Sequence, residues 1–268
     1  MHMVVCLKQV PDATEVTIDP KTNTLIREGV PSIINPYDVH AVEAALQLKD
    51  MYGGKVTVLT MGPPQAEESL KKAIAYGADE AILLSDRKFA GSDTLATSYI
   101  LAQAIRKLGE SEPVDIIFCG KQAIDGDTAQ VGPGIAARLG IPQLTYVMKI
   151  DEVDLEKQEI QVQRKLEALR EVVRAKLPAL LTVEKSLNEI RYASLPNMIK
   201  AATFKVTVLG KDSFEMNEAE LGLKGSPTWV SKIFAPPQRE AGEMLSGGES
   251  AVPELVDRLV KTKIIANI

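Results

Sequence analysis

The densest group of residues that could perform chemistry is the segment 120–133, which reads GKQAIDGDTAQVGP. It follows an apolar run and opens a helical pattern. Gly126 and Gly132 allow a ligand to approach the backbone closely, and the polar groups near the start of the helix are Asp127, Thr128 and Gln130. Free N–H groups at a helix N-terminus suit a phosphate. The segment therefore predicts a nucleotide-binding loop.

This loop differs from the common nucleotide-binding motifs. No Gly-Lys-Ser/Thr follows it, and no G-x-G-x-x-G follows the first apolar run of the chain. Capping of the helix by Asp127 or Thr128 is an alternative, but capping explains one residue and not the whole loop. Asp125 and Asp127 lack the third acidic ligand and the closing Glu of a calcium loop, so we expect no metal site.

Three other segments belong to the same candidate site. In NPYD at 35–38, Asp38 is either a helix N-cap or a contact to ribose or adenine. A second helical pattern opens with Asp93, Thr94 and Thr97, which either cap it or hold a second phosphate or a ring system. Met61 and Gly62 form a turn after a strand, where the glycine also fits simple turn geometry.

The rest of the chain is poor in catalytic side chains. Its 268 residues include two cysteines, two histidines and 4% aromatic residues. Cys6 and Cys119 lie in apolar runs, where we expect small, inert core residues. His40 lies on a helix near the binding edge, where we expect an ordinary helix residue. If the protein performs chemistry, a bound group carries it.

Composition excludes several classes of protein. The balance of 31 basic and 36 acidic residues gives a net charge of −5, which argues against nucleic-acid and lipid surfaces as partners. The aromatic residues are too few for a base-stacking surface. No apolar run approaches the roughly 20 residues that span a membrane, and the N-terminus MHMVVCLKQV lacks the pattern of a signal peptide. We expect a soluble cytoplasmic protein without membrane insertion.

The elements that position these residues alternate along the first half of the chain. Apolar runs occur at 3–10, 55–61, 81–85 and 114–119, and helical patterns end at Gly53, Gly77, Gly109 and near Gly140. This order predicts an α/β fold with a doubly wound, mostly parallel, Rossmann-like sheet. Ligands bind such sheets beyond the carboxyl ends of the strands, which here correspond to 9–13, 60–64, 85–93 and 120–134.

Two regions do not fit a simple crossover. Residues 11–36 predict a small hairpin that turns at 19–23. Residues 143–185 predict extra strands, although 164–176 would also fit an amphipathic helix.

The end of the chain predicts an extended arm. Nine glycine and proline residues between 210 and 248 argue against a compact core, and a helical pattern follows at about 252–263. The arm needs a surface to bury its apolar residues Leu221, Trp229, Ile233 and Phe234. That surface is either a partner or the arm's own domain. We divide the chain into a nucleotide-binding domain at 1–208 and an arm with a final helix at 209–268.

Residues 184–203 form a second unusual block. Its apolar residues are interrupted by Asn188, Pro196 and Asn197. A loop that presents Leu195 ahead of a short helix would expose an apolar anchor for a partner, and the alternative is a core-packed connection.

The chain resembles the β subunit of electron-transfer flavoprotein over essentially its whole length. The motifs that carry the resemblance are VCLKQVPD at 5–12, NPYD at 35–38, GAD at 77–79, the loop at 120–133 and LNEIRYASLPN at 187–197.

The resemblance implies a heterodimer with an α subunit, which carries FAD and which the C-terminal arm embraces. In ordinary members the β subunit holds structural AMP. In the electron-bifurcating branch the same pocket holds a second FAD that takes hydride from NADH. That branch sends one electron to a low-potential acceptor such as ferredoxin and the other through the α-subunit FAD to an acyl-CoA dehydrogenase or reductase.

The resemblance also assigns residues. The pocket maps onto Cys6, Asn35, Pro36, Tyr37, Asp38, Met61, Gly126, Asp127, Thr128, Ala129, Gln130, Val131, Gly132, Pro133 and Gly134. The candidate set is completed by Gly62, Asp93, Thr94, Thr97, Gln122 and Asp125. The recognition loop, which docks on the dehydrogenase, lies within 187–203, with Leu195 as anchor beside Tyr192, Pro196, Met198 and Ile199.

The segments GSDTLATS at 91–98 and DGDTAQVGP at 125–133 resemble the bifurcating branch. Two residues depart from the family pattern: Ile190 replaces a frequent proline, and Ser92 a frequent alanine. Our main hypothesis is a bifurcating β subunit that binds FAD and oxidises NADH. The alternatives are a β subunit with structural AMP and a stand-alone adenine-nucleotide-binding module, which would have no need for the arm.

Overall fold

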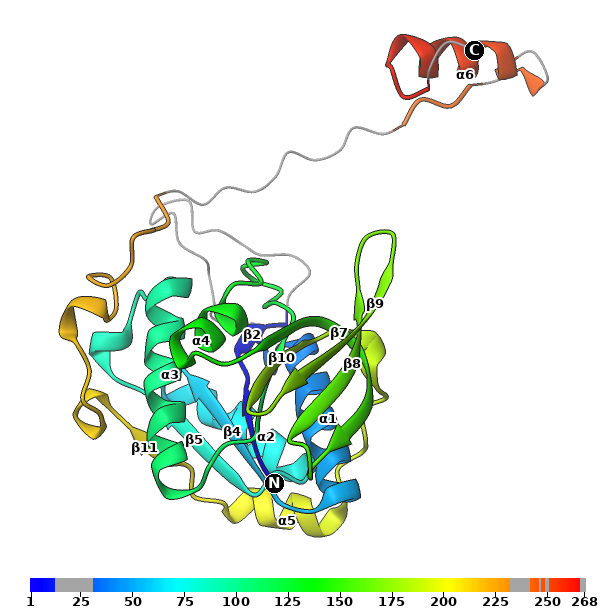
Figure 1. Cartoon of the computed structure of the whole chain (residues 1–268). Helices are drawn as coiled ribbons and strands as arrows, with labels where there is room; N and C mark the ends of the chain where they lie inside the picture. Colours follow the sequence, from blue (N-terminus) through cyan, green and yellow to red (C-terminus); the bar gives the residue numbers. More distant parts are fainter. Residues whose placement is uncertain (13–30, 232–241, 246, 249–250, 266–268) are drawn as a thin grey trace.

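The computed structural model describes residues 1–12, 31–231, 242–245, 247–248 and 251–265 (Figure 1). The first half of the chain alternates strands and helices as predicted. Its elements are β1 (His2–Cys6), β2 (Gln9–Pro11), β3 (Ser32–Ile34), α1 (Pro36–Tyr52), β4 (Lys55–Met61), α2 (Glu67–Tyr76), β5 (Glu80–Leu84), α3 (Thr94–Ser111), β6 (Ile116–Gly120) and α4 (Val131–Leu139).

The second half begins with strands. Its elements are β7 (Gln143–Asp154), β8 (Glu159–Lys165), β9 (Arg170–Lys176), β10 (Ala179–Val183), α5 (Leu195–Thr203), β11 (Thr207–Leu209) and α6 (Ala251–Lys261). Residues 164–176 are therefore strand and not helix, as the register Val162↔Val173 between β8 and β9 shows. The predicted hairpin at 19–23 lies outside the described residues.

One sheet organises the domain, in the order β11-β5-β4-β1-β6-β10-β7-β8-β9. From β11 to β7 neighbouring strands are parallel, and β8 and β9 extend the sheet in antiparallel fashion. The α/β class and the mostly parallel sheet predicted from the sequence are confirmed.

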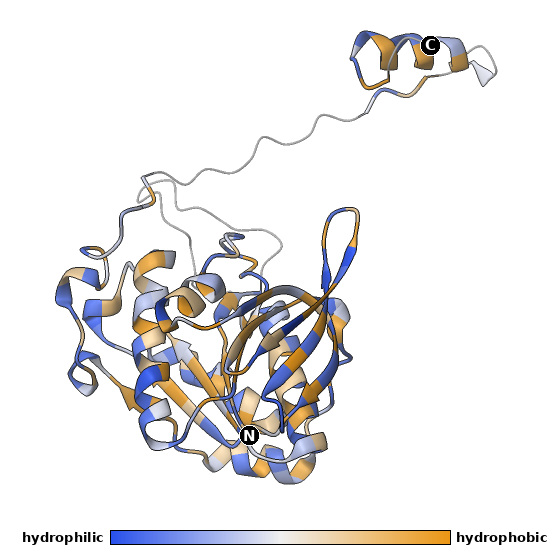
Figure 2. Ribbon diagram, viewed as in Figure 1, coloured by the Kyte–Doolittle hydropathy of each residue, from blue (hydrophilic) through white to orange (hydrophobic). Residues whose placement is uncertain are grey.

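Helices cover both faces of the sheet. One core cluster joins alternate strand residues to α1, α2 and α5, and the other joins the intervening residues to α3 and α4. Figure 2 shows the resulting apolar band along the central strands between more polar outer surfaces. Burial on both faces explains why these strands read as continuous apolar runs.

The chain reverses its direction of winding at β1. The strands β4 and β5 follow on one side of β1, whereas β6 lies on its other side. The carboxyl ends of β1 and β6, at Cys6 and Gly120, therefore flank the topological switch point. Ligand sites of doubly wound sheets lie at this position.

Three predicted element boundaries are wrong. The run 3–10 forms two strands, because β1 ends at Cys6 and β2 pairs instead with β3. The helix α3 continues through Gly109 to Ser111. The helix α4 begins at Val131 and not near residue 128.

The first part of the predicted arm packs on its own domain. Leu221 is only 4% exposed and belongs to the core cluster of α3 and α4, so of the two surfaces considered for this residue, its own domain is the one that buries it. Trp229 is exposed, and Ile233 and Phe234 lie outside the described residues. The packing of 209–268 on a partner thus stays a prediction only for the segment beyond Thr228.

The final helix α6 is amphipathic. Its apolar residues recur at helical spacing as Val252, Leu255, Val256 and Leu259, and none of the described α6 side chains is buried. Over the described ranges, no helix has the length and apolar character that crossing a bilayer requires.

Candidate functional site

Asp38 joins the two strands that flank the switch point. Its Oδ2 accepts a hydrogen bond from the Lys8 N–H at 2.7 Å, and its Oδ1 accepts one from the Gly120 N–H at 3.0 Å. The N-cap of α1 is Asn35, so the alternative that Asp38 is the N-cap is wrong. Each carboxylate oxygen already has a backbone donor, which makes Asp38 a clamp between the loops after β1 and β6.

Burial changes the acidity of this clamp. Desolvation raises the pKa of Asp38 to about 7, although hydrogen bonds from Asn35, Lys8 and Gly120 and the charge of Lys8 lower it. The ordinary pKa of the side chain is 3.8. Between these values the folded protein binds more protons than the unfolded chain, so stability falls as the pH rises through this window.

The Asp38→Asn variant tests this coupling. Between pH 5 and pH 7 the free energy of unfolding of the wild type should fall by about 2 kcal/mol more than that of the variant. Urea unfolding at several pH values measures both slopes. Equal slopes in the two proteins would contradict a raised pKa of Asp38.

Asn35 and Lys8 fix the candidate loop after β6. The buried Asn35 side chain donates to the carbonyl of Gln122 at 2.8 Å and accepts from the Ile124 N–H at 3.1 Å. Lys8 Nζ forms an ion pair with Asp125 at 2.7 Å. Asn35 and Asp125, both predicted pocket residues, thus hold the loop in place. The contribution of Lys8 was not predicted, although its position directly after β1 is a usable signal.

The loop before α4 leaves the first turn of this helix without a capping side chain among the described residues. Asp127 and Ala129 adopt the left-handed conformation, with φ of 50° and 53°, which is uncommon for residues other than glycine. The Gln122 side chain donates to Asp127 Oδ1 at 2.7 Å. Gln130 is the N-cap of α4, and within the described chain its side chain forms no capping hydrogen bond. Capping by Asp127 or Thr128 is therefore wrong, and N–H groups at this helix start can receive an anion.

Two glycines of α4 serve packing. An added Cβ at Gly132 would lie 2.6 Å from Cγ2 of Thr182, and one at Gly134 would lie 2.8 Å from Cβ of Ser98. These glycines bring α4 close to β10 and α3. In contrast, an added Cβ at Gly126 meets nothing within 4 Å among the described residues, so of these three glycines only Gly126 borders open space.

The second predicted helix start, at α3, is capped. Asp93 Oδ1 accepts from the N–H groups of Leu95 and Ala96 at 2.9 and 3.1 Å. Its Oδ2 accepts from the hydroxyl and the N–H of Thr228 at 2.8 and 3.1 Å. The capping alternative thus describes Asp93, which also anchors the beginning of the arm.

The starts of α3 and α4 are nevertheless adjacent. Thr94 Oγ1 donates to Gln130 Oε1 at 2.8 Å, and Thr97 is half-buried one turn further along α3. Both helices direct their N-termini toward the carboxyl edge of the sheet. The structure therefore brings the two predicted phosphate-binding helix starts into contact.

The remaining pocket candidates line the ends of β1 and β4. Cys6 pairs in register with Cys119 across β1 and β6, and both are buried core residues, as predicted. The hydrogen bond with Cys6 and burial raise the pKa of the Cys119 thiol, which disfavours the reactive thiolate. Met61 ends β4, and the Gly62 N–H donates to the carbonyl of Leu84 at the end of the neighbouring strand β5, at 3.0 Å.

A charged and aromatic cluster next to this edge was not predicted. Lys121 forms an ion pair with Glu184 at 3.1 Å, and its Nζ lies 5.8 Å from the ring centre of Tyr37 and 5.1 Å from that of Tyr146. Lys185 Nζ lies 4.8 Å from the ring centre of Tyr37. Tyr37, a predicted pocket residue beside Pro36, thus stacks against two cations.

The predicted recognition loop forms an exposed apolar surface. Tyr192 is 97% exposed and Leu195 69%, and Pro196, Met198 and Ile199 are also exposed. Leu195 is the first residue of α5 and does not lie ahead of it. Leu195, Met198 and Ile199 share one helix face through their spacing. We call this surface, residues 188–199, the docking segment.

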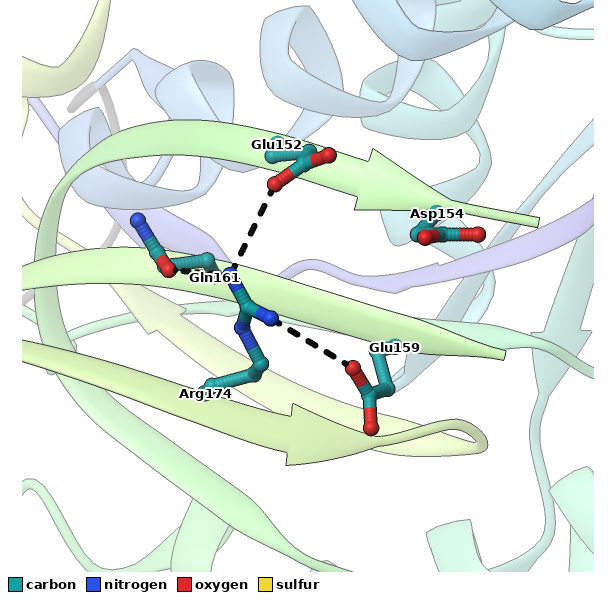
Figure 3. Close-up of a pocket in the computed structure, with 5 residues that line it drawn as sticks. All are labelled: Glu152, Asp154, Glu159, Gln161 and Arg174. Carbon is teal, nitrogen blue, oxygen red and sulfur yellow. Dashed lines mark hydrogen bonds and ion pairs between the residues drawn. The ribbon is translucent and has the colours of Figure 1, made fainter. Parts of the chain in front are cut away.

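A hollow elsewhere on the molecule has no room for an organic ligand. It lies on the antiparallel strands β7 to β9 and has a volume of about 10 Å³ (Figure 3). The Arg174 side chain occupies its centre, paired with Glu152 and Glu159 at 3.7 Å. At most a water molecule fits such a space.

Comparison with known proteins assigns the chain to a family. Residues 22–213 match the model of the electron transfer flavoprotein domain. Protein FixA of Bradyrhizobium diazoefficiens is 52% identical over 262 residues, which cover 97% of this chain and 91% of the relative. The electron transfer flavoprotein subunit beta of Thermoanaerobacterium thermosaccharolyticum is 52% identical over 267 residues, with coverage of 99% and 100%.

A third relative, the electron transfer flavoprotein subunit beta of Megasphaera elsdenii, is 49% identical over 273 residues, with coverage of 99% and 100%. The fold, the site at the switch point and these matches define the class of electron transfer flavoproteins. Within that class, the chain belongs to the β-subunit family. This membership implies an α-subunit partner, redox partners and a role in electron transport.

Proposed function

We propose that this chain is the β subunit of an electron-bifurcating flavoprotein that binds FAD at the carboxyl edge of its sheet. The observation that supports this proposal is the contact between the starts of α3 and α4 through Thr94 and Gln130 at 2.8 Å. FAD has two phosphates, and its larger size requires an adjacent second set of polar groups. Two helix N-termini at one edge fit such a ligand.

The residues of this chain bind and orient the group. The uncapped start of α4 would hold one phosphate through backbone N–H groups, while Thr94 and Thr97 offer hydroxyls at α3. Asp38, Asn35 and Lys8 fix the loops around it. When bound, FAD would supply the redox chemistry with NADH as electron donor, which the side chains themselves do not provide.

Structural AMP in the same site is the second candidate, and one observation favours it. Asp93 occupies the N–H groups of Leu95 and Ala96, so the start of α3 has fewer free donors for a second phosphate. AMP needs only the phosphate site at α4. The alternative of a stand-alone nucleotide-binding module is not supported, because the chain belongs to a family of subunits.

The proposed partner proteins would bind different surfaces of this chain. The apolar face of α6 would pack on the α subunit, and the docking segment would contact an acyl-CoA dehydrogenase or reductase. A low-potential acceptor such as ferredoxin would receive the second electron. The proposed setting is the cytoplasm.

The composition of the purified heterodimer tests this function. The chain is produced with its α subunit, the complex is denatured, and the released FAD and AMP are quantified. Two FAD per heterodimer support the bifurcating function. One FAD with one AMP would overturn it in favour of the structural-AMP subunit.

The double variant Asp127→Ala/Thr128→Ala tests the position of the pocket. Removing the Gln122–Asp127 hydrogen bond and the Thr128 hydroxyl should release the loop before α4 and empty the β-subunit site. The α-subunit FAD should remain, so about half of the total flavin is lost if both sites hold FAD.

The control for that variant is Asp212→Ala/Ser213→Ala, a second acid and hydroxyl pair that lies in an exposed turn away from the loop. Its nucleotide content should equal that of the wild type. Unchanged nucleotide content in the Asp127/Thr128 variant would disprove the assigned pocket.

A further inference from the structure

The docking segment is tied to α1 through paired side-chain contacts. Asn188 Oδ1 lies 2.8 Å from His40 Nδ1, and Asn188 Nδ2 donates to the carbonyl of His40 at 3.0 Å. These two contacts fix both ends of one amide group. The chain therefore enters the docking segment in a defined position relative to α1.

An ion pair fixes the segment a second time. Arg191 Nε and Nη2 donate to the two carboxylate oxygens of Glu43 at 2.8 and 3.1 Å, and Nη2 also donates to Asp50 at 2.8 Å. The Arg191 N–H contacts Glu43 as well, at 3.3 Å. Such a two-pronged pair specifies orientation as well as proximity.

Burial makes this pair unlike the surface ion pairs of the chain. Glu43 is only 4% exposed, whereas exposed ion pairs contribute little to stability. A buried carboxylate without its cation carries a large desolvation penalty. The buried Glu43 carboxylate therefore needs the Arg191 guanidinium as its cation. Glu43 in turn holds the backbone of the docking segment in place at Arg191.

The contacts lie directly beside the exposed surface. Tyr192 follows Arg191 and is 97% exposed, and α5 begins three residues later. On the far side of the segment, Lys200 donates to the carbonyl of Ala78 at 3.2 Å and Ala201 is buried. The exposed residues are therefore held between two fixed ends.

We propose that Glu43 and Arg191 are positioning residues that hold the docking segment in its partner-binding conformation before the partner arrives. This inference rests on the proposed docking function. Ordering a flexible segment during association opposes binding, so a segment ordered in advance binds more tightly. The pair would thus strengthen docking without forming the apolar contact itself.

The variant Arg191→Met in the full heterodimer tests the proposal. Hydrogen exchange of amides 188–199, measured without partner, should become at least tenfold faster. With NADH as electron donor and a purified acyl-CoA dehydrogenase or reductase as acceptor, the KM for this acceptor should rise about tenfold while kcat stays unchanged. The flavin and AMP content should not change.

A second variant separates positioning from stability. In Glu43→Met/Arg191→Met no unpaired charge remains buried, so folding should recover. The KM and the hydrogen-exchange rates of amides 188–199 should nevertheless stay above the wild-type values. Two methionines do not reproduce the two hydrogen bonds between the Arg191 guanidinium and the Glu43 carboxylate. The control Arg174→Met removes another arginine with two carboxylate partners, on β9, and should leave all values unchanged.

Leu195→Ala distinguishes failure of the inference from failure of the docking function. If Leu195→Ala leaves KM unchanged, the docking function itself is wrong. If it raises KM while Arg191→Met and the double variant do not, the positioning role is overturned. The positioning role would also be overturned if amides 188–199 of the Arg191→Met variant exchanged hydrogen at the wild-type rate.

Discussion

Replacing Gly120 with alanine should lower the free energy of unfolding by about 3 kcal/mol, which is a large part of the stability of a typical domain. An added Cβ at this position would lie 2.7 Å from Cβ of Tyr37 and 2.8 Å from the backbone nitrogen of Asp38. It would also contact Asp38 Oδ1 directly. Because α1 and β6 are both packed in the core, neither can yield without losing other contacts.

The loss should extend to the site. The Gly120 N–H donates to Asp38 at 3.0 Å, and displacement of β6 from α1 would break this hydrogen bond. The loop that follows Gly120 would then lose its position, so we expect the nucleotide proposed for this site to be lost together with stability. Urea unfolding and the nucleotide content of the purified protein measure the two effects.

Gly109→Ala is the matched control. An added Cβ at Gly109 meets nothing within 4 Å in the described part of the chain, and the residue lies inside α3. Alanine is the better helix former, so this variant should gain about 0.5–1 kcal/mol. Equal stability of the Gly120 and Gly109 variants would show that the close approach of α1 to β6 has been misassigned.

The second large effect is expected for α6. In the variant Leu255→Asp/Leu259→Asp, two residues of its apolar face become charged. The proposed burial of each leucine on the α subunit would be worth at least about 1.5 kcal/mol, so the affinity of the two subunits should fall by more than about a hundredfold. Titration calorimetry or analytical ultracentrifugation of the separated subunits measures this affinity.

Charge changes on the opposite face provide the control. Asp257 and Lys261 lie outside the apolar stripe of α6, and the variant Asp257→Ser/Lys261→Ser should retain wild-type affinity. Folding of the nucleotide-binding domain should be equal in all three proteins, because none of the described α6 side chains is buried in it. Undiminished heterodimer formation by the leucine variant would show that the arm does not use this face.

The strands and the helix ends could be predicted because each depends on a local pattern of residue types. The central strands are apolar runs because they are buried on both faces, as at Val4 and Ile117, and the helices between them end at glycines such as Gly53 and Gly77. For the docking segment, the interruption of the apolar residues by Asn188 and Pro196 fits an exposed anchor and a core-packed connection alike. The structure decides for exposure, since Leu195 is 69% exposed.

Other assignments failed because one residue type serves several structural roles. An aspartate near a helix start suggests a cap, which is true of Asp93 and false of Asp38. A glycine in a loop suggests ligand access, yet Gly132 lies in α4 and faces Thr182 of β10. An apolar residue in a glycine-rich arm fits burial on a partner or on its own domain, and Leu221 fills the core of its own domain.

The sequence by itself thus determined the mostly parallel α/β sheet and the edge at which the candidate site is expected, because periodicity and residue type report burial and local backbone geometry. The tertiary structure alone decided that Asp38 binds a donor 82 residues away, that Arg191 pairs with Glu43, and that Thr94 meets Gln130. These contacts depend on strand register and on the packing of helices over the sheet, which no local pattern encodes.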